Sequence, residues 1–299
     1  MRAIKHKNLK WIDILVPKDE DIKLLEKFGF HHLILEEIKT PTYHPLIESY
    51  RKYLYLILHF PDFDSVKGQI LPQEIDFLIT ESTLITVRYK KFDDFEEIFQ
   101  EVQSRPGKYL GKTTGHLLYN IIKKLFQRTF PELNRIQEAI DKIEENVLNR
   151  FDENVIESIA STKNSIIDFL RAIKPQKVVW DAIREVAMKF WGSRMKPYVS
   201  DMVADYNRIL YFAETHREIL DSLHMTSSSL LDNKRNYVIK ILTIFTAIIL
   251  PLSLFASIYG MNLVNLPLAA HPDAFWFFLG GMSAVIAGML IYFRVKKWL

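Results

Sequence analysis

Hydrophobic and polar positions follow three successive patterns along the chain, and the first covers residues 1–105. Short runs rich in Ile, Leu, Tyr and Val predict strands, and two stretches with apolar residues at helical spacing predict helices. The predicted strands are Trp11–Val16, Tyr53–Phe60, Glu74–Thr80 and Thr83–Tyr89, and the predicted helices are Asp19–Phe28 and Asp93–Gln103. This alternation indicates an N-terminal α/β domain with a small sheet. Arg105-Pro106-Gly107 breaks the pattern and predicts the domain's end.

The second pattern is helical and covers residues 106–196. Four helices are predicted, separated by Pro131, Phe151-Asp152 and Pro175. They are Tyr109–Thr129, Pro131–Asn149, Val155–Ile173 and Val178–Trp191. The first two patterns together predict an α+β fold for the soluble part.

The third pattern begins near Pro197, which suits the first turn of a helix. From Tyr198 to Leu250 the chain contains neither Gly nor Pro. Seven apolar positions at spacings of three, four and seven form a coiled-coil-like seam: Val203, Tyr206, Leu210, Ala213, Leu220, Leu223 and Leu230. The pattern predicts one stalk helix that continues into the membrane over residues 197–259. Two helices with a break near Thr226–Ser229 are the alternative.

Two uncharged runs predict membrane spans. Ile241–Asn262 has no charge over 22 residues, and Ala274–Phe293 has none over 20. A helix rises about 1.5 Å per residue and the hydrocarbon core is roughly 30 Å thick, so each run is long enough to cross it. The predicted spans are residues 238–259 and 274–293, joined by an external loop, 260–273, and followed by a basic tail, 294–299.

Charge sets the predicted orientation. Basic residues flank both spans on one side (Lys234, Arg235 and Lys240 before the first; Arg294, Lys296 and Lys297 after the second), and the loop has neither Lys nor Arg. The positive-inside rule then places both termini in the cytoplasm, which in a bacterium means the inner membrane. Lys240, Arg294, Lys296 and Lys297 would form a basic collar at the inner face.

The amino-acid composition argues against several classes of function. The net charge is +3, and the residues after Arg235 account for all of it, so the soluble part has no basic excess for binding nucleic acid. The chain has no cysteine, which excludes disulfides and thiolate metal sites. No catalytic constellation or nucleotide-binding loop stands out, so we expect no enzyme activity and no organic cofactor.

A narrow polar stripe runs along the first predicted span. Thr243, Thr246, Ser253 and Ser257 lie on one helix face, with Leu250 filling the gap. Small hydroxyl residues let membrane helices pack closely, and this is the favoured interpretation for an isolated stripe. The same stripe would line a pore in a ring of subunits, because two spans cannot enclose an aqueous path alone.

Gly260-Met261-Asn262 ends the first span and also has two interpretations. Gly and Asn both accept the left-handed conformation of a helix C-cap, which spacing alone favours. A ring of Asn262 side-chain oxygens and Gly260 carbonyls would instead meet the water shell of Mg²⁺, an ion that dehydrates reluctantly.

Tyr259-Gly260-Met261-Asn262, followed by a short loop, a second span and a basic tail, closely resembles the CorA family of divalent-cation channels. His32–Ile38 and Tyr53–Leu58 resemble further segments of that family. The resemblance implies a funnel-shaped homopentamer in membrane lipid, with the first span lining the pore and the second surrounding it. It implies a selectivity filter at Gly260, Met261 and Asn262. It places six more residues toward the axis: Asn236, Leu242, Thr246, Leu250, Ser253 and Ser257.

The resemblance also implies that cytoplasmic Mg²⁺ binds between subunits and holds the pore shut. Matching acids are Glu36, Glu37 and Asp201, with Asp205 one turn later. Clustered carboxylates repel when empty and a dication bridges them. The alternative is that these acids are solvated surface groups.

The expected function is therefore a channel for hydrated divalent cations, with Mg²⁺ as both the transported and the regulatory ion and Co²⁺ or Ni²⁺ as further candidates. A Zn²⁺ transporter of the same architecture is one alternative. A membrane-anchored coiled-coil scaffold or signalling protein is another, although it leaves the polar stripe and Gly260–Asn262 without a role.

Overall fold

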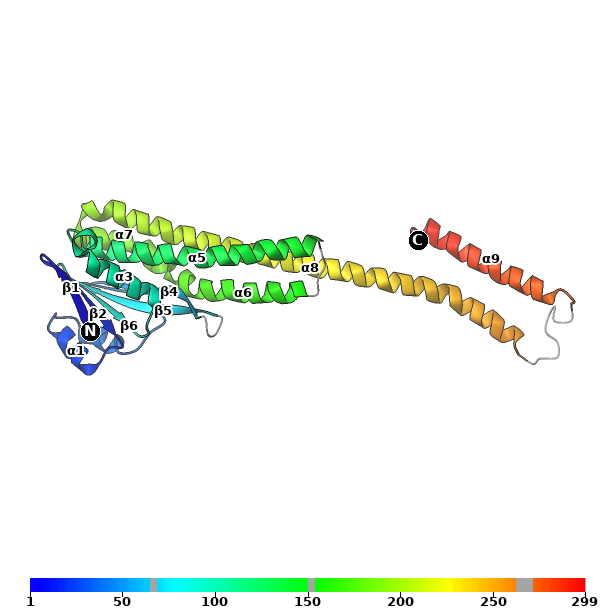
Figure 1. Cartoon of the computed structure of the whole chain (residues 1–299), viewed down its shortest axis with the longest axis horizontal. Helices are drawn as coiled ribbons and strands as arrows, with labels where there is room; N and C mark the ends of the chain where they lie inside the picture. Colours follow the sequence, from blue (N-terminus) through cyan, green and yellow to red (C-terminus); the bar gives the residue numbers. More distant parts are fainter. Residues whose placement is uncertain (65–68, 150–153, 262–270, 299) are drawn as a thin grey trace. The chain divides into compact units, whose positions relative to one another are not determined.

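The computed structural model describes residues 1–64, 69–149, 154–261 and 271–298. It forms two compact units, Met1–His224 and Met225–Leu299 (Figure 1). Residues on both sides of the predicted boundary at Arg105 belong to the first unit.

A six-stranded sheet is the centre of the first unit. Its strands are β1 (Arg2–His6), β2 (Leu9–Leu15), β3 (Leu46–Ser49), β4 (Leu54–Asp64), β5 (Gln69–Ile79) and β6 (Thr83–Arg88). Their order across the sheet is β1-β2-β6-β5-β4-β3. Only the β2–β6 pair is parallel among the described strands, with Ile12 opposite Ile85. The central strands are buried along most of their length, because both sheet faces are covered.

Two short helices, α1 (Asp19–Glu26) and α2 (His32–Glu37), cover one face of the sheet. Leu25 and Ile34 from these helices are buried against Tyr55, Ile57 and Val87 of the strands. This face carries the acids of α2 that the sequence analysis associates with regulation.

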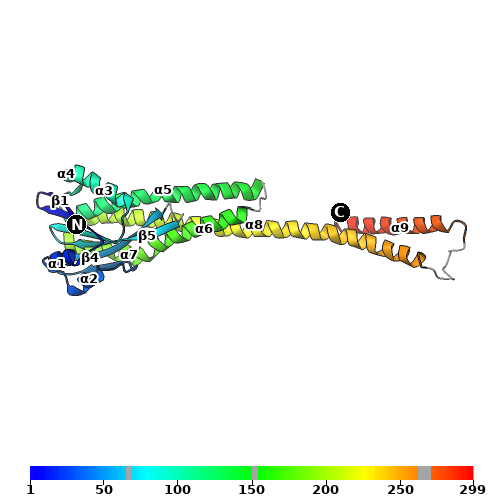
Figure 2. The same cartoon turned by 60° about the horizontal axis from the view of Figure 1, so that its bottom comes forward.

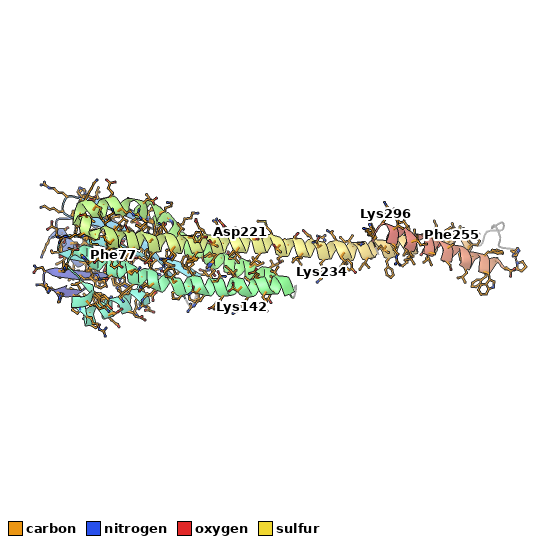
Figure 3. All side chains as sticks on the ribbon, turned by 90° about the horizontal axis from the view of Figure 1, so that it is seen from above. Phe77, Lys142, Asp221, Lys234, Phe255 and Lys296 are labelled. Atoms are coloured by element: carbon orange, nitrogen blue, oxygen red, sulfur yellow. The ribbon has the colours of Figure 1, made fainter. Side chains whose placement is uncertain are left out.

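Long helices cover the other face (Figure 2). They are α5 (Thr114–Asn149), α6 (Asn154–Ile173) and α7 (Lys177–Trp191), preceded by α3 (Asp93–Ser104) and α4 (Pro106–Tyr109). Aromatic rings fill the contact: the centroids of Trp11 and Phe99 lie 4.9 Å apart, and those of Phe60 and Phe126 lie 5.9 Å apart. Phe77, labelled in Figure 3, is fully buried in this layer.

The predicted helix break at Pro131 is wrong, because α5 is continuous through it. A proline removes one backbone donor, and tertiary packing of the helix face outweighs that loss here. The buried stripe continues on both sides of the proline, through Phe126, Leu133, Ile136 and Ile140.

The predicted stalk helix is confirmed as α8 (Lys196–Tyr259), which is continuous past Thr226–Ser229 and past Pro251. The alternative with two helices is therefore wrong. Short 3₁₀ turns at Lys174–Gln176 and Ser193–Met195 flank α7 and lead into this helix.

The apolar seam of α8 begins by packing within its own chain. Val203, Tyr206, Ala213 and Leu220 are buried in the first unit. The ring of Tyr206 stacks on Trp180 of α7 at 5.4 Å, and its hydroxyl donates to the carbonyl of Ile173 at 3.2 Å. The first part of the seam is therefore occupied by intrachain contacts, which weakens the coiled-coil scaffold interpretation.

The second unit contains the end of α8 and the helix α9 (Ala274–Val295), and both are long and apolar enough to cross a membrane. In this unit α9 lies beside the last part of α8 (Figures 1 and 2).

Candidate functional site

The last part of α8 has one face turned to α9. Ile244 is buried, the rings of Tyr259 and Phe278 lie 4.9 Å apart, and Phe255 shares an apolar groove with Gly281 and Met282 (Figure 3). Large apolar residues therefore make the contact between these two helices.

The polar stripe lies on a different face of α8. All six residues predicted to line a pore are exposed: Asn236, Leu242, Thr246, Leu250, Ser253 and Ser257. The stripe is thus not the face that packs on α9 of the same chain. If the stripe packs on another helix, that helix is not α9 of the same chain.

The threonine hydroxyls of this region both donate their protons within α8. Thr243 Oγ1 donates to the carbonyl of Ile239 at 2.8 Å, and Thr246 Oγ1 donates to the carbonyl of Leu242 at 2.9 Å. Each hydroxyl has a single proton, so its oxygen can only accept further hydrogen bonds. A neutral acceptor suits the water shell of a cation, whose waters present their hydrogens outward.

The end of α8 leaves little room for a side chain at position 260. Gly260 N–H donates to the carbonyl of Ala256 at 2.9 Å, and Met261 N–H donates to that of Ile258 at 3.3 Å. A Cβ at Gly260 would lie only 3.1 Å from the oxygen of Ala256. Among the described glycines, only Gly29, Gly111 and Gly192 have positive φ, so the left-handed cap interpretation does not hold for Gly260.

Asn262 lies outside the described residues, as does the loop to residue 270. Of the predicted filter, the structure therefore places Gly260 and Met261, both exposed at the end of α8.

The predicted basic collar is brought together at the other end of this unit. Lys240 Nζ donates to the carbonyl of Lys297 at 3.4 Å, and Arg294 and Lys296 lie in the last turn and at the C-cap of α9 (Figure 3). Positive charge is stabilising at the C-terminus of a helix, where carbonyls lack partners.

The four predicted regulatory acids lie on two helices, Glu36 and Glu37 on α2 and Asp201 and Asp205 on α8. Within the parts of the chain that the structure describes, no group of three or more metal-ligating side chains is assembled. A dication bound by both pairs would therefore need two subunits.

Three of the four acids have distinct local environments. Glu36 pairs with Lys39 at 2.6 Å. Burial raises the pKa of Glu37, and the charges of Glu48 and Glu74 raise it further. Hydrogen bonds from Lys123 and Tyr119 lower the pKa of the Asp201 carboxyl, against the opposing effect of burial.

A buried acid, missed in the sequence analysis, lies beneath α2. Asp76 of β5 is fully buried, and both Tyr55 and Tyr89 place a hydroxyl within 3.1 Å of its Oδ2. Its Oδ1 has no hydrogen-bond partner among the described residues. The available signal was the pair of acids at alternate positions of one strand, Glu74 and Asp76, which share a sheet face.

The hydrogen-bond count favours a protonated Asp76. Tyr89 has one hydroxyl proton but two acceptors, the carbonyl of Ile38 at 3.3 Å and Asp76 Oδ2 at 3.1 Å. If Asp76 is neutral, it donates to Tyr89, and Tyr89 donates to Ile38, the C-cap of α2. Burial, reinforced by the charge of Glu74, raises the pKa of Asp76 well above its usual range. The carboxyl group thus helps to hold the end of the helix that carries Glu36 and Glu37.

We expect Asp76→Asn to stabilise the protein at pH 8 and to change little at pH 4. A folded-state pKa above the unfolded value gives stability that is present at low pH and lost as the pH rises through the folded pKa. An amide keeps the neutral donor and acceptor at all pH values. The gain should be at least about 1.4 kcal/mol, the free energy that corresponds to a tenfold change in proton affinity, measured by thermal unfolding of the full chain in detergent.

Asp13→Asn is the matched control, because Asp13 is the other nearly fully buried aspartate of the sheet and pairs with Arg88 at 2.6 Å. Removing its charge should destabilise the protein at pH 8. Equal effects of the two substitutions would contradict a neutral Asp76.

A family model described as CorA-like Mg²⁺ transporter protein matches residues 6–297. The cobalt/magnesium transport protein CorA of Thermotoga maritima is 27% identical over 97% of this chain and 83% of its own length. The protein of the same description from Methanocaldococcus jannaschii is 25% identical over 97% of this chain and 92% of its own length. The solved structure of the complete CorA magnesium transporter from the latter organism has a TM-score of 0.82 at 23% identity, covering 100% of this chain and 95% of that one.

Proposed function

The chain belongs to the CorA family, and from this premise we propose that it is a homopentameric channel for divalent cations in the inner membrane, with both termini in the cytoplasm. Mg²⁺ is the proposed cargo, with Co²⁺ as a second ion, because both relatives are cobalt/magnesium transport proteins. No bond is made or broken during transport, so the protein is not an enzyme.

One observation carries the proposal. The polar stripe of α8, from Thr243 to Ser257, is exposed while a different face of the helix packs on α9. Small hydroxyl residues on one face of a membrane helix typically meet another helix or an aqueous path and not lipid. A ring of subunits with this face inward encloses an aqueous path and leaves α9 outside it.

The residues on the path would act on a hydrated ion. Thr246, Ser253 and Ser257 supply neutral oxygens and Leu250 narrows the path. Mg²⁺ gives up its waters reluctantly, so acceptors that contact the water shell suit it better than charged ligands. At the mouth, Gly260 carbonyls and Asn262 side chains form the proposed filter. A dication entering the cytoplasm gains about 4.6 kcal/mol per 100 mV of membrane potential, since each charge gains about 2.3.

The test is ion entry into proteoliposomes loaded with a Mg²⁺-sensitive dye, at an inside-negative potential. Entry of Mg²⁺ that rises with the potential supports the proposal. A Zn²⁺-sensitive dye in a parallel sample identifies zinc as the cargo if only Zn²⁺ enters. No entry of any dication into vesicles that contain intact oligomers would overturn the proposal.

Regulation is part of the proposal. Cytoplasmic Mg²⁺ would bind between Glu36 and Glu37 of one subunit and Asp201 and Asp205 of its neighbour. Neutralising Glu37→Gln together with Asp201→Asn should raise the Mg²⁺ concentration that half-inhibits flux by at least about tenfold, because the number of charged ligands controls dication affinity. Flux is measured against Mg²⁺ on the cytoplasmic side.

The control removes the same two charges elsewhere. Asp181→Asn with Glu185→Gln changes two exposed acids of α7 that pair with Lys177 and Lys189. This variant should respond to Mg²⁺ as the unmodified protein does. An equal shift in both variants would mean that net charge, and not these residues, controls inhibition.

A further inference from the structure

The two α8 acids in the proposed regulatory site already share a cation from the same chain. Lys123 of α5 places its Nζ 2.8 Å from Asp201 Oδ2 and 2.5 Å from Asp205 Oδ2. Tyr119, one turn earlier on α5, donates its hydroxyl to the same oxygen of Asp201 at 2.9 Å. One ammonium group therefore bridges two carboxylates one turn apart on α8.

The two carboxylates differ in their access to ions. The side chain of Asp205 is 5% exposed and that of Asp201 is 44% exposed. Arg208 adds a weaker contact to Asp205 at 3.8 Å. Asp201 is thus the carboxylate that a dication from solution reaches first, and Lys123 is the charge it meets there.

A dication at Asp201 and the ammonium group of Lys123 would repel each other at this distance. The repulsion lowers dication affinity unless Lys123 moves away. Once Lys123 moves, Asp201 and Asp205 are left as like charges that a dication would bridge. The ammonium group of Lys123 and a bound dication therefore lower each other's affinity for this pair of carboxylates.

We propose that Lys123 is a tethered cation that competes with Mg²⁺ for Asp201 and Asp205 and thereby sets the Mg²⁺ concentration that inhibits transport. This inference rests on the proposed function, since it assumes a regulatory site at Asp201. It adds a residue that binds no Mg²⁺ and yet controls how strongly Mg²⁺ binds.

Lys123→Gln tests the competition. The variant keeps a side chain able to donate to one of the aspartates but removes the charge. A neighbouring charge changes ion binding at a carboxylate by about tenfold or more, so the half-inhibiting Mg²⁺ concentration should fall about tenfold. Lys123→Arg keeps the charge and should stay close to the unmodified protein.

Lys124→Gln is the matched control. Lys124 is the next residue of α5 and pairs with Glu101 at 2.6 Å. It is the same substitution on the same helix turn, away from Asp201. The half-inhibiting concentration should not change in this variant.

A second readout does not need transport. Mg²⁺ that binds the folded protein raises its thermal unfolding temperature, so unfolding of the full-length protein in detergent is measured against free Mg²⁺. In Lys123→Gln the stabilising concentration should fall about tenfold, and without Mg²⁺ the variant should unfold at a lower temperature, because two close carboxylates then repel.

The outcomes distinguish the competition by Lys123 from the proposed transport function. The proposed competition is overturned if the Mg²⁺ midpoint of Lys123→Gln is unchanged or higher by either readout. It is also overturned if Asp201→Asn leaves the Mg²⁺ midpoint unaltered. Under a purely structural role, Lys123→Gln would lower the unfolding temperature equally at every Mg²⁺ concentration. If the proteoliposomes show no flux at all, the proposed function fails, while the unfolding midpoints still decide the role of Lys123.

Discussion

Asn262→Ala is expected to reduce Mg²⁺ entry into proteoliposomes by about 100-fold while the protein stays folded and assembled. A net hydrogen bond contributes about 0.5–1.5 kcal/mol. In a ring of five subunits every copy loses its amide oxygen at once, so the combined loss is about 2.5–7.5 kcal/mol, and a 100-fold change corresponds to about 2.7 kcal/mol. Alanine at 262 leaves intact the backbone bonds that end α8, from Gly260 to Ala256 and from Met261 to Ile258.

Asn233→Ala is the control for this experiment. Asn233 is an exposed asparagine of α8 that precedes the first predicted span. Its loss should leave flux within about twofold, as expected for a surface substitution away from the path. Full flux through Asn262→Ala would move the filter away from the end of α8, whereas a membrane-anchored scaffold would show no flux in either the variant or the unmodified protein.

Ser253→Leu is expected to block transport, with flux falling at least about tenfold. Five leucine side chains around the proposed path would replace hydroxyl acceptors with a hydrophobic constriction, and such constrictions stop ions by expelling water. The soluble unit lies outside the substituted region, so Mg²⁺-dependent unfolding in detergent should be retained. Flux and unfolding are measured on the same preparation.

The chain offers an unusually close control in Ser283→Leu. Ser283 is an exposed serine of the second predicted span, and its hydroxyl donates to the carbonyl of Leu279 at 2.9 Å. It lies on α9, outside the proposed path. Leucine there should be tolerated, since lipid-facing leucine is favourable in a membrane. An equal loss of flux in both variants would contradict a pore lined by this face of α8.

The large elements could be predicted because each has a strong local signal. The two uncharged runs correspond to the end of α8 and to α9, and the stretch without Gly or Pro corresponds to the rest of α8. The strand β4 has a continuous apolar run, Leu54–Leu58, and β6 is rich in β-branched residues. These signals depend on burial in protein or lipid, and burial follows directly from hydrophobicity.

Short or charged elements were missed for physical reasons. β1 has the sequence Arg-Ala-Ile-Lys-His, and its strand conformation depends on pairing with β2 and on the ion pair of Arg2 with Asp13. α2 and β3 have only six and four residues, too few for a periodic pattern. At Pro131 the sequence predicted a helix break that does not occur, because the packing of α5 outweighs the local preference of one residue.

Part of the candidate site could likewise be predicted from the sequence, and part could not. The stripe on α8 could be read from spacing, since residues three, four and seven apart share a helix face. Which face meets α9 depends on contacts that spacing does not contain. Lys123 lies 78 residues before Asp201, and nothing local to either residue indicates that they meet.

The division of the chain at His224 has a consequence for biosynthesis. The sheet, its covering helices and the buried part of the seam are all complete by His224, and both spans follow that residue. Domains generally fold as units, N-terminal first, while synthesis continues for several seconds. The soluble unit can therefore pack on the ribosome before the first span emerges. If the unit folds first, translation order gives a reason, independent of the flanking lysines and arginines, for the proposed location of this unit on the side of the membrane where it is synthesised.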